Sequence, residues 1–301
     1  MAKKNRRKQE NLPEGMSRRQ AKLAARAAER EALQKDPRPY EGLAAEAELV
    51  ALQEFVPSAT AQVTVKDTPV QLVTVLPGAV AAMVREDGDR LVALQVAAHS
   101  QNPGRDLAYA LNWVLGAKEG EQLQSTAADG QQPALKDIFP ADATLDVTSY
   151  DDFSWWFPED AQVPPQIQQA MVAANDAVIP SVEVEAAAPG AVWWINPGSG
   201  KAHIRWVRTE DNENQMLAAL ARIAARGELN LGEGTKFAGA FRTHGVVVPV
   251  WDLDPAVEPA SYVDALVALN KAIEAEYAND AQLSADERKQ LDNIKSRQVT
   301  I

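Results

Sequence analysis

The first residues that could do chemistry are Gly198-Ser199-Gly200-Lys201, which look like a phosphate-binding loop. Such a loop needs a strand, the pattern GxxxxGK[ST] and then a helix, because backbone amides and the helix N-terminus must both face the phosphates. Here Ile195 stands where the first glycine is required, Ala202 follows the lysine, and the next residues alternate as in a strand. We therefore predict a hairpin turn at this position and no nucleotide site.

The histidines His99, His203 and His244 could hold a metal or act in catalysis. None of them has HxH or HxxxH spacing, so a metal site that combines them with Asp211 lacks a local motif. No GxSxG motif is present, and the Asp and Glu residues are spread over many expected helices and turns. We predict no catalytic, cofactor-binding or metal-binding residues and no cofactor. An apolar pocket with converging carboxylates would instead favour an enzyme.

Two tryptophan doublets, Trp155-Trp156 and Trp193-Trp194, fall on expected strands. Neighbours on a strand point to opposite faces, so one side chain of each doublet should enter the core. The other is either covered by a helix or part of an aromatic contact surface, since Trp and Arg are enriched at binding hot spots. For the second alternative, the expected protein-contact residues are Trp194, Arg205 and Trp206.

Internal similarity indicates how these residues are positioned. PGAVAAM at 77–83 matches PGAVWWI at 189–195, and IQQAMVAANDAVI at 167–179 matches YVDALVALNKAIE at 262–274. We predict an α+β fold made of two tandem copies of a unit with the order helix, three strands, helix, two strands, helix.

The expected elements follow from apolar periodicity and from Pro, Gly and capping residues. In the first copy, helices are expected at 46–54, 102–118 and 165–178, and strands at 70–76, 79–84, 90–98, 144–148 and 153–157. In the second copy, strands are expected at 182–186, 192–196, 202–208, 236–241 and 246–251, and helices at 213–226 and 259–277. The expected segments are an arm at 1–43, repeats at 44–179 and 180–279, and a C-terminal helix or tail at 280–301, where Ser284 and Glu287 have capping-box spacing.

Charge divides the chain into a basic arm and an acidic body. Residues 1–38 hold 12 Lys or Arg and 5 Asp or Glu, a net of +7, which leaves −19 of the total of −12 for the remainder. The body should therefore repel nucleic acid. We expect a disordered arm that becomes helical near Arg18 and either contacts RNA or an acidic partner or remains a solvated tail. The expected contact residues are Arg6, Arg7, Lys8, Arg18 and Arg19.

Cysteine is absent, which fits a reducing cytoplasm, and no segment predicts a membrane span or a secretory signal. The stretches GMSRRQAKLAARAAERE and RPYEGLAAEAELVALQEFVPSA, with the Ala-rich, Trp-doublet body, resemble an actinobacterial family of unknown function. The element order over 44–277 resembles the type III secretion chaperone-like (YbjN-like) fold. That resemblance implies a pseudo-dimer within one chain, and hence a monomer.

Together these features predict a non-enzymatic cytoplasmic binding or chaperone-like protein with an acidic body, a basic arm and a protein partner. One alternative is an RNA- or ribosome-associated factor bound through the arm, and a second alternative is an enzyme. Binding to a membrane is not expected.

Overall fold

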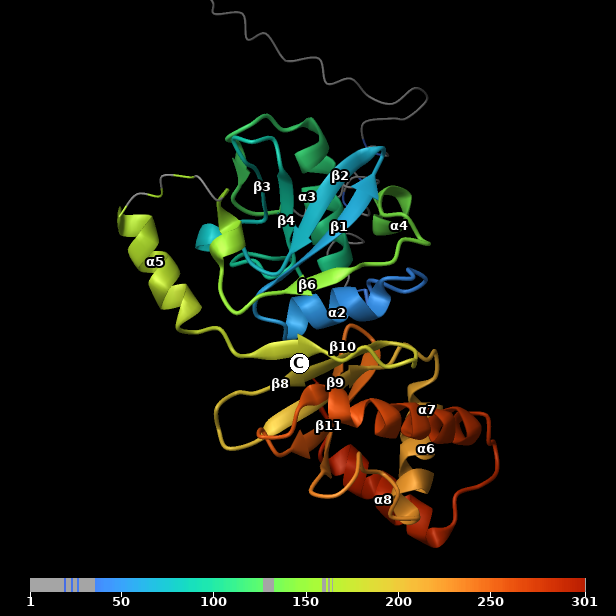
Figure 1. The fold of residues 1–301 in the computed structure, drawn as a ribbon. Helices are drawn as coiled ribbons and strands as arrows, with labels where there is room; N and C mark the ends of the chain where they lie inside the picture. Colours follow the sequence, from blue (N-terminus) through green and yellow to red (C-terminus); the bar gives the residue numbers. More distant parts are fainter. Residues whose placement is uncertain are drawn as a thin grey trace, which may run out of the picture.

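In the computed structural model, residues 36–126, 133–158, 161, 163 and 165–300 are described, together with Arg19, Leu23 and Arg26. This part of the chain forms an α+β fold with two sheets. Figure 1 shows the layers from top to bottom: the first sheet, helix α2 (Glu46–Glu54), the second sheet, and the helices of residues 213–296.

The first sheet, sheet A, has the strand order β5-β3-β4-β2-β1-β6, with β2 and β4 parallel and the other pairs antiparallel. Its strands are β1 (Ala59–Val65), β2 (Thr68–Val73), β3 (Ala82–Val84), β4 (Arg90–Ala93), β5 (Gln122–Leu123) and β6 (Val147–Ser149). Strands β1 and β2 form a tight hairpin, because Lys66 and Asp67 both adopt positive φ, 48° and 64°, as a two-residue type I′ turn requires.

The second sheet, sheet B, has the strand order β12-β10-β11-β9-β8-β7. Its strands are β7 (Ser181–Glu183), β8 (Ala191–Ile195), β9 (Ala202–Val207), β10 (Lys236–Thr243), β11 (Val246–Leu253) and β12 (Val299–Thr300). Strands β8 and β9 pair antiparallel across Gly198–Lys201, with Gly198 and Gly200 at φ 72° and 85°. The predicted hairpin turn at this glycine-rich segment is confirmed.

Helix α2 joins the two sheets because its central residues, 49–52, are all apolar and buried. Its residues Ala47, Leu49, Val50, Ala51 and Leu52 are all buried. A helix with this pattern must be covered on every face. It contacts β8 and β9 of sheet B and belongs to one hydrophobic core that also contains Val63 of β1 and Trp193 of β8. One continuous core therefore links the first and second halves of the chain.

Helix α3 (Pro103–Gly116) covers β3 and β4 of sheet A. It begins at the predicted cap, where the Asn102 side chain accepts a hydrogen bond from the Arg105 amide at 3.3 Å. Pro103 suits the first helical position because it has no amide hydrogen that would need a partner. The short helix α4 (Leu135–Ile138) packs against α3.

A second core lies on the other face of sheet B, under α6 (Glu213–Ala225), α7 (Val263–Tyr277) and α8 (Ala285–Ser296). It contains Trp194, whereas Trp193 belongs to the first core, so the doublet divides between two covered faces as a strand requires. The predicted C-terminal capping box is also confirmed. The Ser284 side chain accepts from the Glu287 amide at 3.3 Å, and the Glu287 carboxylate accepts from the Ser284 amide at 2.7 Å.

The predicted order of helices and strands is found in the second half of the chain and not in the first, so the two halves are not copies of one unit. From α5 (Pro165–Asn175) to α7 the order is helix, three strands, helix, two strands, helix. The first half has four strands between α2 and α3, because the β1–β2 hairpin adds a strand that prediction missed. Its strands after α3, β5 and β6, lie at opposite edges of sheet A, whereas β10 and β11 form a hairpin beside β9.

One further expectation in the first half is also wrong. The strand predicted at 153–157 is a 3₁₀ turn, η2 (Ser154–Trp156), which stacks Trp156 on Phe153 with ring centroids 4.5 Å apart. The helix predicted at 165–178 is present as α5, and its Val172 is 60% exposed. The aligned glycines Gly78 and Gly190 both have positive φ, but Pro77–Ala79 is a 3₁₀ turn, whereas Ala191 begins β8. Local sequence likeness here extends to the conformation of one glycine and not to strand pairing.

Candidate ligand-binding site

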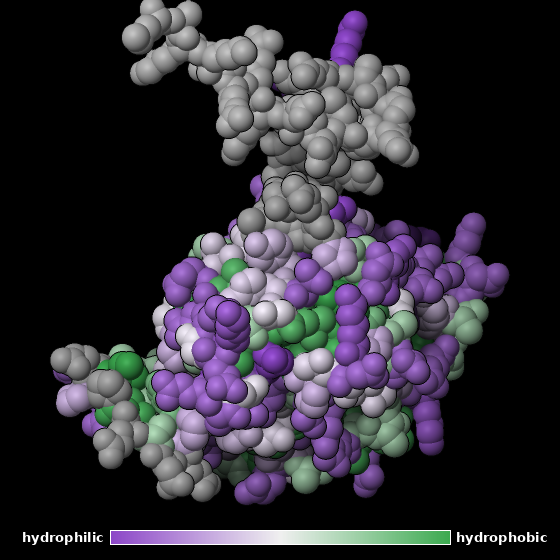
Figure 2. Space-filling view, turned by 90° about the horizontal axis from the view of Figure 1, so that it is seen from above, coloured by the Kyte–Doolittle hydropathy of each residue, from purple (hydrophilic) through white to green (hydrophobic). Residues whose placement is uncertain are grey.

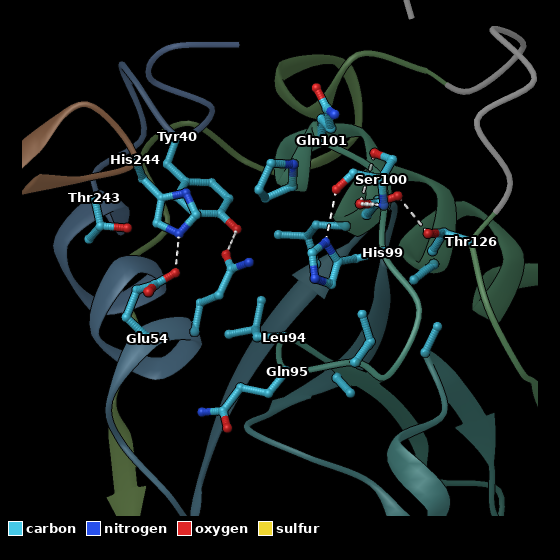
Figure 3. A pocket seen from close by; sticks show the side chains of 18 of the residues that line it. Tyr40, Glu54, Leu94, Gln95, His99, Ser100, Gln101, Thr126, Thr243 and His244 are labelled. Carbon is cyan, nitrogen blue, oxygen red and sulfur yellow. Dashed lines mark hydrogen bonds and ion pairs between the residues drawn. The ribbon is translucent and has the colours of Figure 1, made fainter. Parts of the chain in front are cut away.

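A pocket of about 1050 Å³ opens where segments from both halves of the chain meet. The C-terminal end of α2, the segment after β4, the start of α3 and the β10–β11 turn surround it (Figure 3). Its side chains fall into two polar walls and a largely apolar floor. The volume is in the upper range for sites that hold small organic ligands or cofactors.

The first wall is built on the β10–β11 turn. His244 adopts φ 47° and Gly245 φ 80°, and a Cβ atom on Gly245 would lie 2.5 Å from the carbonyl oxygen of Pro37. The glycine therefore lets the segment before α2 pack against the turn. This packing places Nε2 of His244 2.5 Å from Oε1 of Glu54, at the end of α2.

Tyr40 completes this wall. Its ring lies 5.6 Å from the His244 ring between centroids, and its hydroxyl donates a hydrogen bond to the Gln53 side chain (Figure 3). Burial raises the pKa of Tyr40, and the carboxylates of Glu54 and Asp106 raise it further. The phenol therefore remains neutral and acts as a hydrogen-bonding group over the physiological pH range.

The opposite wall is organised by Asp106 in the first turn of α3. Its carboxylate accepts hydrogen bonds from the amide and hydroxyl of Ser100, at 2.8 and 3.0 Å, and from the Thr126 hydroxyl at 2.5 Å. A carboxylate in the first turn of a helix is also stabilised by the helix dipole. His99 lies beside this cluster, with Nδ1 2.9 Å from the carbonyl oxygen of Ser100.

Small side chains create the space between the walls. The floor and sides include Ala79, Ala81, Ala93, Ala97 and Ala110. The carboxylates of Asp36, Glu54 and Asp106 line the pocket, whereas the arginine that lines it, Arg242, is already bound to Glu213 at 3.1 Å. The pocket is therefore a negatively charged cavity with an apolar floor.

Arg38 fixes the two halves near this pocket. Its Nε atom lies 2.7 Å from Glu46 of α2, and its Nη1 atom lies 3.0 Å from Asp211, which follows β9. A further hydrogen bond of 2.5 Å reaches the carbonyl oxygen of Thr209. The hydrogen bond to Glu46 is the main reason that the pKa of Arg38 is raised. The guanidinium thus bridges the start of the body, the first half and the second half.

The predicted contact surface of Trp194, Arg205 and Trp206 does not form. Trp194 is 8% exposed and Trp206 is 0% exposed, and both lie in the core under α6 and α7. Arg205 precedes Trp206 on β9 and points to the opposite face, over the rings of Phe55 and Phe241. The correction follows from strand geometry: adjacent residues cannot share one face, and helices cover the face of the tryptophans.

Other sequence-predicted residues are also separated by the fold. Arg6, Arg7, Lys8 and Arg18 lie outside the described residues, and Arg19 is a helical, exposed residue. His99 and His244 line the pocket, whereas His203 lies 3.2 Å from Asp252 on sheet B. Within the described part of the chain, no group of three or more His, Asp or Glu side chains is arranged to hold a metal ion.

Sequence reasoning missed Tyr40, Glu54 and Asp106. Tyr40 lies in a segment that looks like a linker. Glu54 is the last residue of a helix, and its contact partner, His244, lies 190 residues further along the chain. The one local signal was Asp106, which follows the recognisable cap of α3 by four residues. No sequence pattern indicates that these side chains meet.

The described residues thus define a two-sheet α+β protein with a pocket between its halves, and Figure 2 shows a mainly hydrophilic face with a smaller hydrophobic area near its centre. The family model DUF5926, a family of unknown function, matches residues 39–301, and the chain belongs to this family. No curated protein and no solved structure matches the chain. Among the helices of the described residues, none has the length and apolar character needed to cross a membrane.

Proposed function

We propose that the protein is a non-enzymatic binding protein that holds a small organic molecule with a cationic nitrogen and an apolar body. One observation carries this proposal: the carboxylates of Glu54 and Asp106 line opposite walls of a pocket whose floor is rich in alanine. An amine would be attracted by both carboxylates, and its apolar body would cover the floor.

The charge balance of the pocket supports a cationic ligand over an anionic one. Arg242 is neutralised by Glu213, so it offers no free positive charge to an anion. Both Glu54 and Asp106 raise the pKa of Tyr40, which places the negative potential inside the pocket. Tyr40 and His244 supply polar contacts that could fix the orientation of the ligand.

The hydrogen bonding of the pocket supports binding rather than catalysis. The Ser100 hydroxyl donates to Asp106 and accepts from the Asn102 amide, both at 3.0 Å. The nearby His99 ring contacts the Ser100 carbonyl oxygen and not its hydroxyl. The base within reach of the Ser100 hydroxyl is Asp106, and this carboxylate also accepts from the Ser100 amide and the Thr126 hydroxyl, contacts that hold the wall in place. The converging carboxylates would have favoured an enzyme, but both are engaged in contacts that stabilise the walls.

The wider setting of this proposal comes from the sequence. The lack of cysteine supports a cytoplasmic location, and the family resemblance supports an actinobacterial source. The element order from α5 to α7 supports a chaperone-like fold for the second half alone. The joint core of the two halves supports a monomer. The basic arm would add a salt-sensitive contact with RNA or an acidic protein partner.

Three indole compounds of different charge test the proposal by calorimetry: tryptamine (cationic), tryptophol (neutral) and indole-3-propionate (anionic). At this pocket, measured as the binding that the pocket variant Ala97→Trp weakens, tryptamine should bind about tenfold more tightly than the other two, the effect of roughly 1.4 kcal/mol of charge attraction. The Glu54→Gln substitution should weaken the binding of tryptamine and leave the affinity for tryptophol unchanged. Equal affinity for all three compounds would contradict the proposed ligand class.

Blocking the pocket provides a second arm. Ala97 is an exposed residue that lines the pocket, so Ala97→Trp should obstruct the pocket without disturbing the core and should strongly weaken tryptamine binding. Ala187→Trp is the matched control, because Ala187 is exposed and does not line the pocket. Unchanged tryptamine binding by Ala97→Trp would show that the compound binds elsewhere.

A further inference from the structure

A second, smaller groove of about 330 Å³ lies on the face of sheet B that is turned toward α2. Its lining includes Phe55, Arg205, Gly239, Phe241, Arg297 and Val299. The groove has the opposite chemistry to the first pocket, because two arginines and two phenylalanines line it.

Arg205 is the central residue of this groove. Its guanidinium carbon lies 5.3 Å from the centroid of the Phe55 ring and 5.9 Å from that of the Phe241 ring. The two rings meet edge to face, with centroids 6.2 Å apart. Stacking on aromatic rings holds a guanidinium in place and leaves its N–H groups available for an acceptor.

No hydrogen bond or ion pair joins the Arg205 side chain to any described residue. Desolvation lowers the pKa of Arg205, and no carboxylate offsets this effect. By contrast, the described arginines that make ion pairs are Arg38, Arg85, Arg208, Arg222, Arg226 and Arg242. A half-buried guanidinium without an acceptor costs free energy, so an anion that bound there would gain an unused set of donors.

Arg297 adds a second positive charge at the rim. It is exposed and makes no ion pair with the described residues. Its backbone approaches β10 at Gly239, where a β-bulge interrupts the pairing with β11. A Cβ atom at Gly239 would lie 3.2 Å from the carbonyl oxygen of Arg297, so the glycine permits this close approach. Glu54 also lines the groove, and its single negative charge is outnumbered by the positive charges of Arg205 and Arg297.

We propose that this groove binds the carboxylate of a small aromatic acid, with Arg205 as the primary anchor and Arg297 as a second positive charge at the rim. A guanidinium fork matches a carboxylate with two parallel hydrogen bonds. Phe55 and Phe241 then flank the aromatic body, and Val250 and Val299 extend the apolar lining. Inorganic phosphate would satisfy the arginines but would leave these apolar side chains without a contact.

The test uses the full chain and four probes in calorimetry at constant ionic strength: benzoate, benzamide, benzylamine and inorganic phosphate. In the Ala97→Trp variant, whose first pocket is obstructed, benzoate should bind, and its neutral and cationic counterparts should not. Arg205→Gln should lower the affinity for benzoate by about tenfold or more, which is the usual effect of losing a charge-assisted hydrogen bond. Arg205→Lys should restore only part of the affinity, because lysine has the charge without the fork.

Arg297→Gln alters an exposed side chain and should lower the affinity for benzoate severalfold. This variant keeps the proposal testable if the Arg205→Gln protein does not fold. Arg226→Gln is the matched control, since Arg226 is exposed, pairs with Glu228 and Glu276 and lines neither the groove nor the first pocket. Benzoate affinity that is unchanged in both Arg205→Gln and Arg297→Gln would overturn the site. Tighter binding of phosphate than benzoate would overturn the assignment to an aromatic acid. Ala97→Trp should not affect benzoate, which separates this site from the first pocket.

Discussion

Nε2 of His244 lies 2.5 Å from Oε1 of Glu54, although 190 residues separate them in the chain. The contact joins the β10–β11 turn of sheet B to the end of α2, and with Tyr40 it forms one wall of the larger pocket. The halves of the chain are therefore linked by a polar contact as well as by their common core.

Replacing His244 with asparagine should remove this contact and retain the turn, because asparagine tolerates positive φ better than most residues. We expect His244→Asn to lower the free energy of unfolding by about 1–2 kcal/mol, the usual cost of losing a partly buried hydrogen bond to a charged group. Urea unfolding measures this change. A double-mutant cycle with Glu54→Gln should show that the two effects are not additive. Simple additivity would mean that the two side chains act independently.

The neighbouring glycine should be far less tolerant of substitution than a glycine of similar φ elsewhere. At Gly245 (φ 80°) an added Cβ would lie 2.5 Å from the Pro37 oxygen and 2.7 Å from Cβ of Arg38. At Gly198 (φ 72°) nothing lies within 4 Å. We expect Gly198→Ala to cost about 1 kcal/mol and Gly245→Ala about 3 kcal/mol or more, because only the latter adds a backbone clash to the strain. Thermal unfolding of the two variants decides this, and equal losses would refute a close approach at Gly245.

Glu183 on β7 predicts a pH dependence of stability. Its pKa is raised from 4.5 to about 7 by burial and by the carboxylates of Glu48, Glu185 and Asp146. The folded state therefore retains a proton that the unfolded state has lost between these pH values. Stability should fall as pH rises from 4.5 to 7 and should level off above that.

In the Glu183→Gln variant, this loss should largely disappear and stability at pH 8 should rise by about 1–2 kcal/mol, a value reduced for partial solvent screening. Urea midpoints at pH 5 and pH 8 provide the measurement. Glu258→Gln, at an exposed position, serves as the control and should follow the wild type. A wild-type protein that is more stable at pH 8 than at pH 5 would be evidence against this assignment.

The arm prediction is tested by removing residues 1–35. The deletion stops before Asp36 and Arg38, because Arg38 binds Glu46 and Asp211 and its loss would alter the body. If the five named basic residues contact RNA, the slope of log affinity against log salt should become shallower by roughly 3 to 4, at about 0.7 per phosphate contact. Titration of single-stranded RNA at several salt concentrations measures the slope. The same slope with and without the arm would exclude it as the RNA-binding element.

Much of the local structure was predictable from short stretches of sequence. The caps at Asn102 and Ser284 place the starts of α3 and α8, and the glycines at 198 and 200 place a hairpin turn. These features depend on residues within one turn of each other, so the sequence alone determines them. The split of Trp193 and Trp194 between two faces follows in the same way from the two-residue period of a strand.

Tertiary structure alone decided which strands pair, what covers each face and where the pockets form. The matched PGAV segments share a glycine with positive φ, yet β3 and β8 occupy different places in their sheets, since pairing depends on all the strands that compete for an edge. Likewise, Trp206 is buried and Arg205 lies between two phenylalanines only because α2 and α6 cover opposite faces of sheet B. Glu54 and His244 meet for the same reason: packing of distant apolar surfaces brings them together, and no local pattern records that packing.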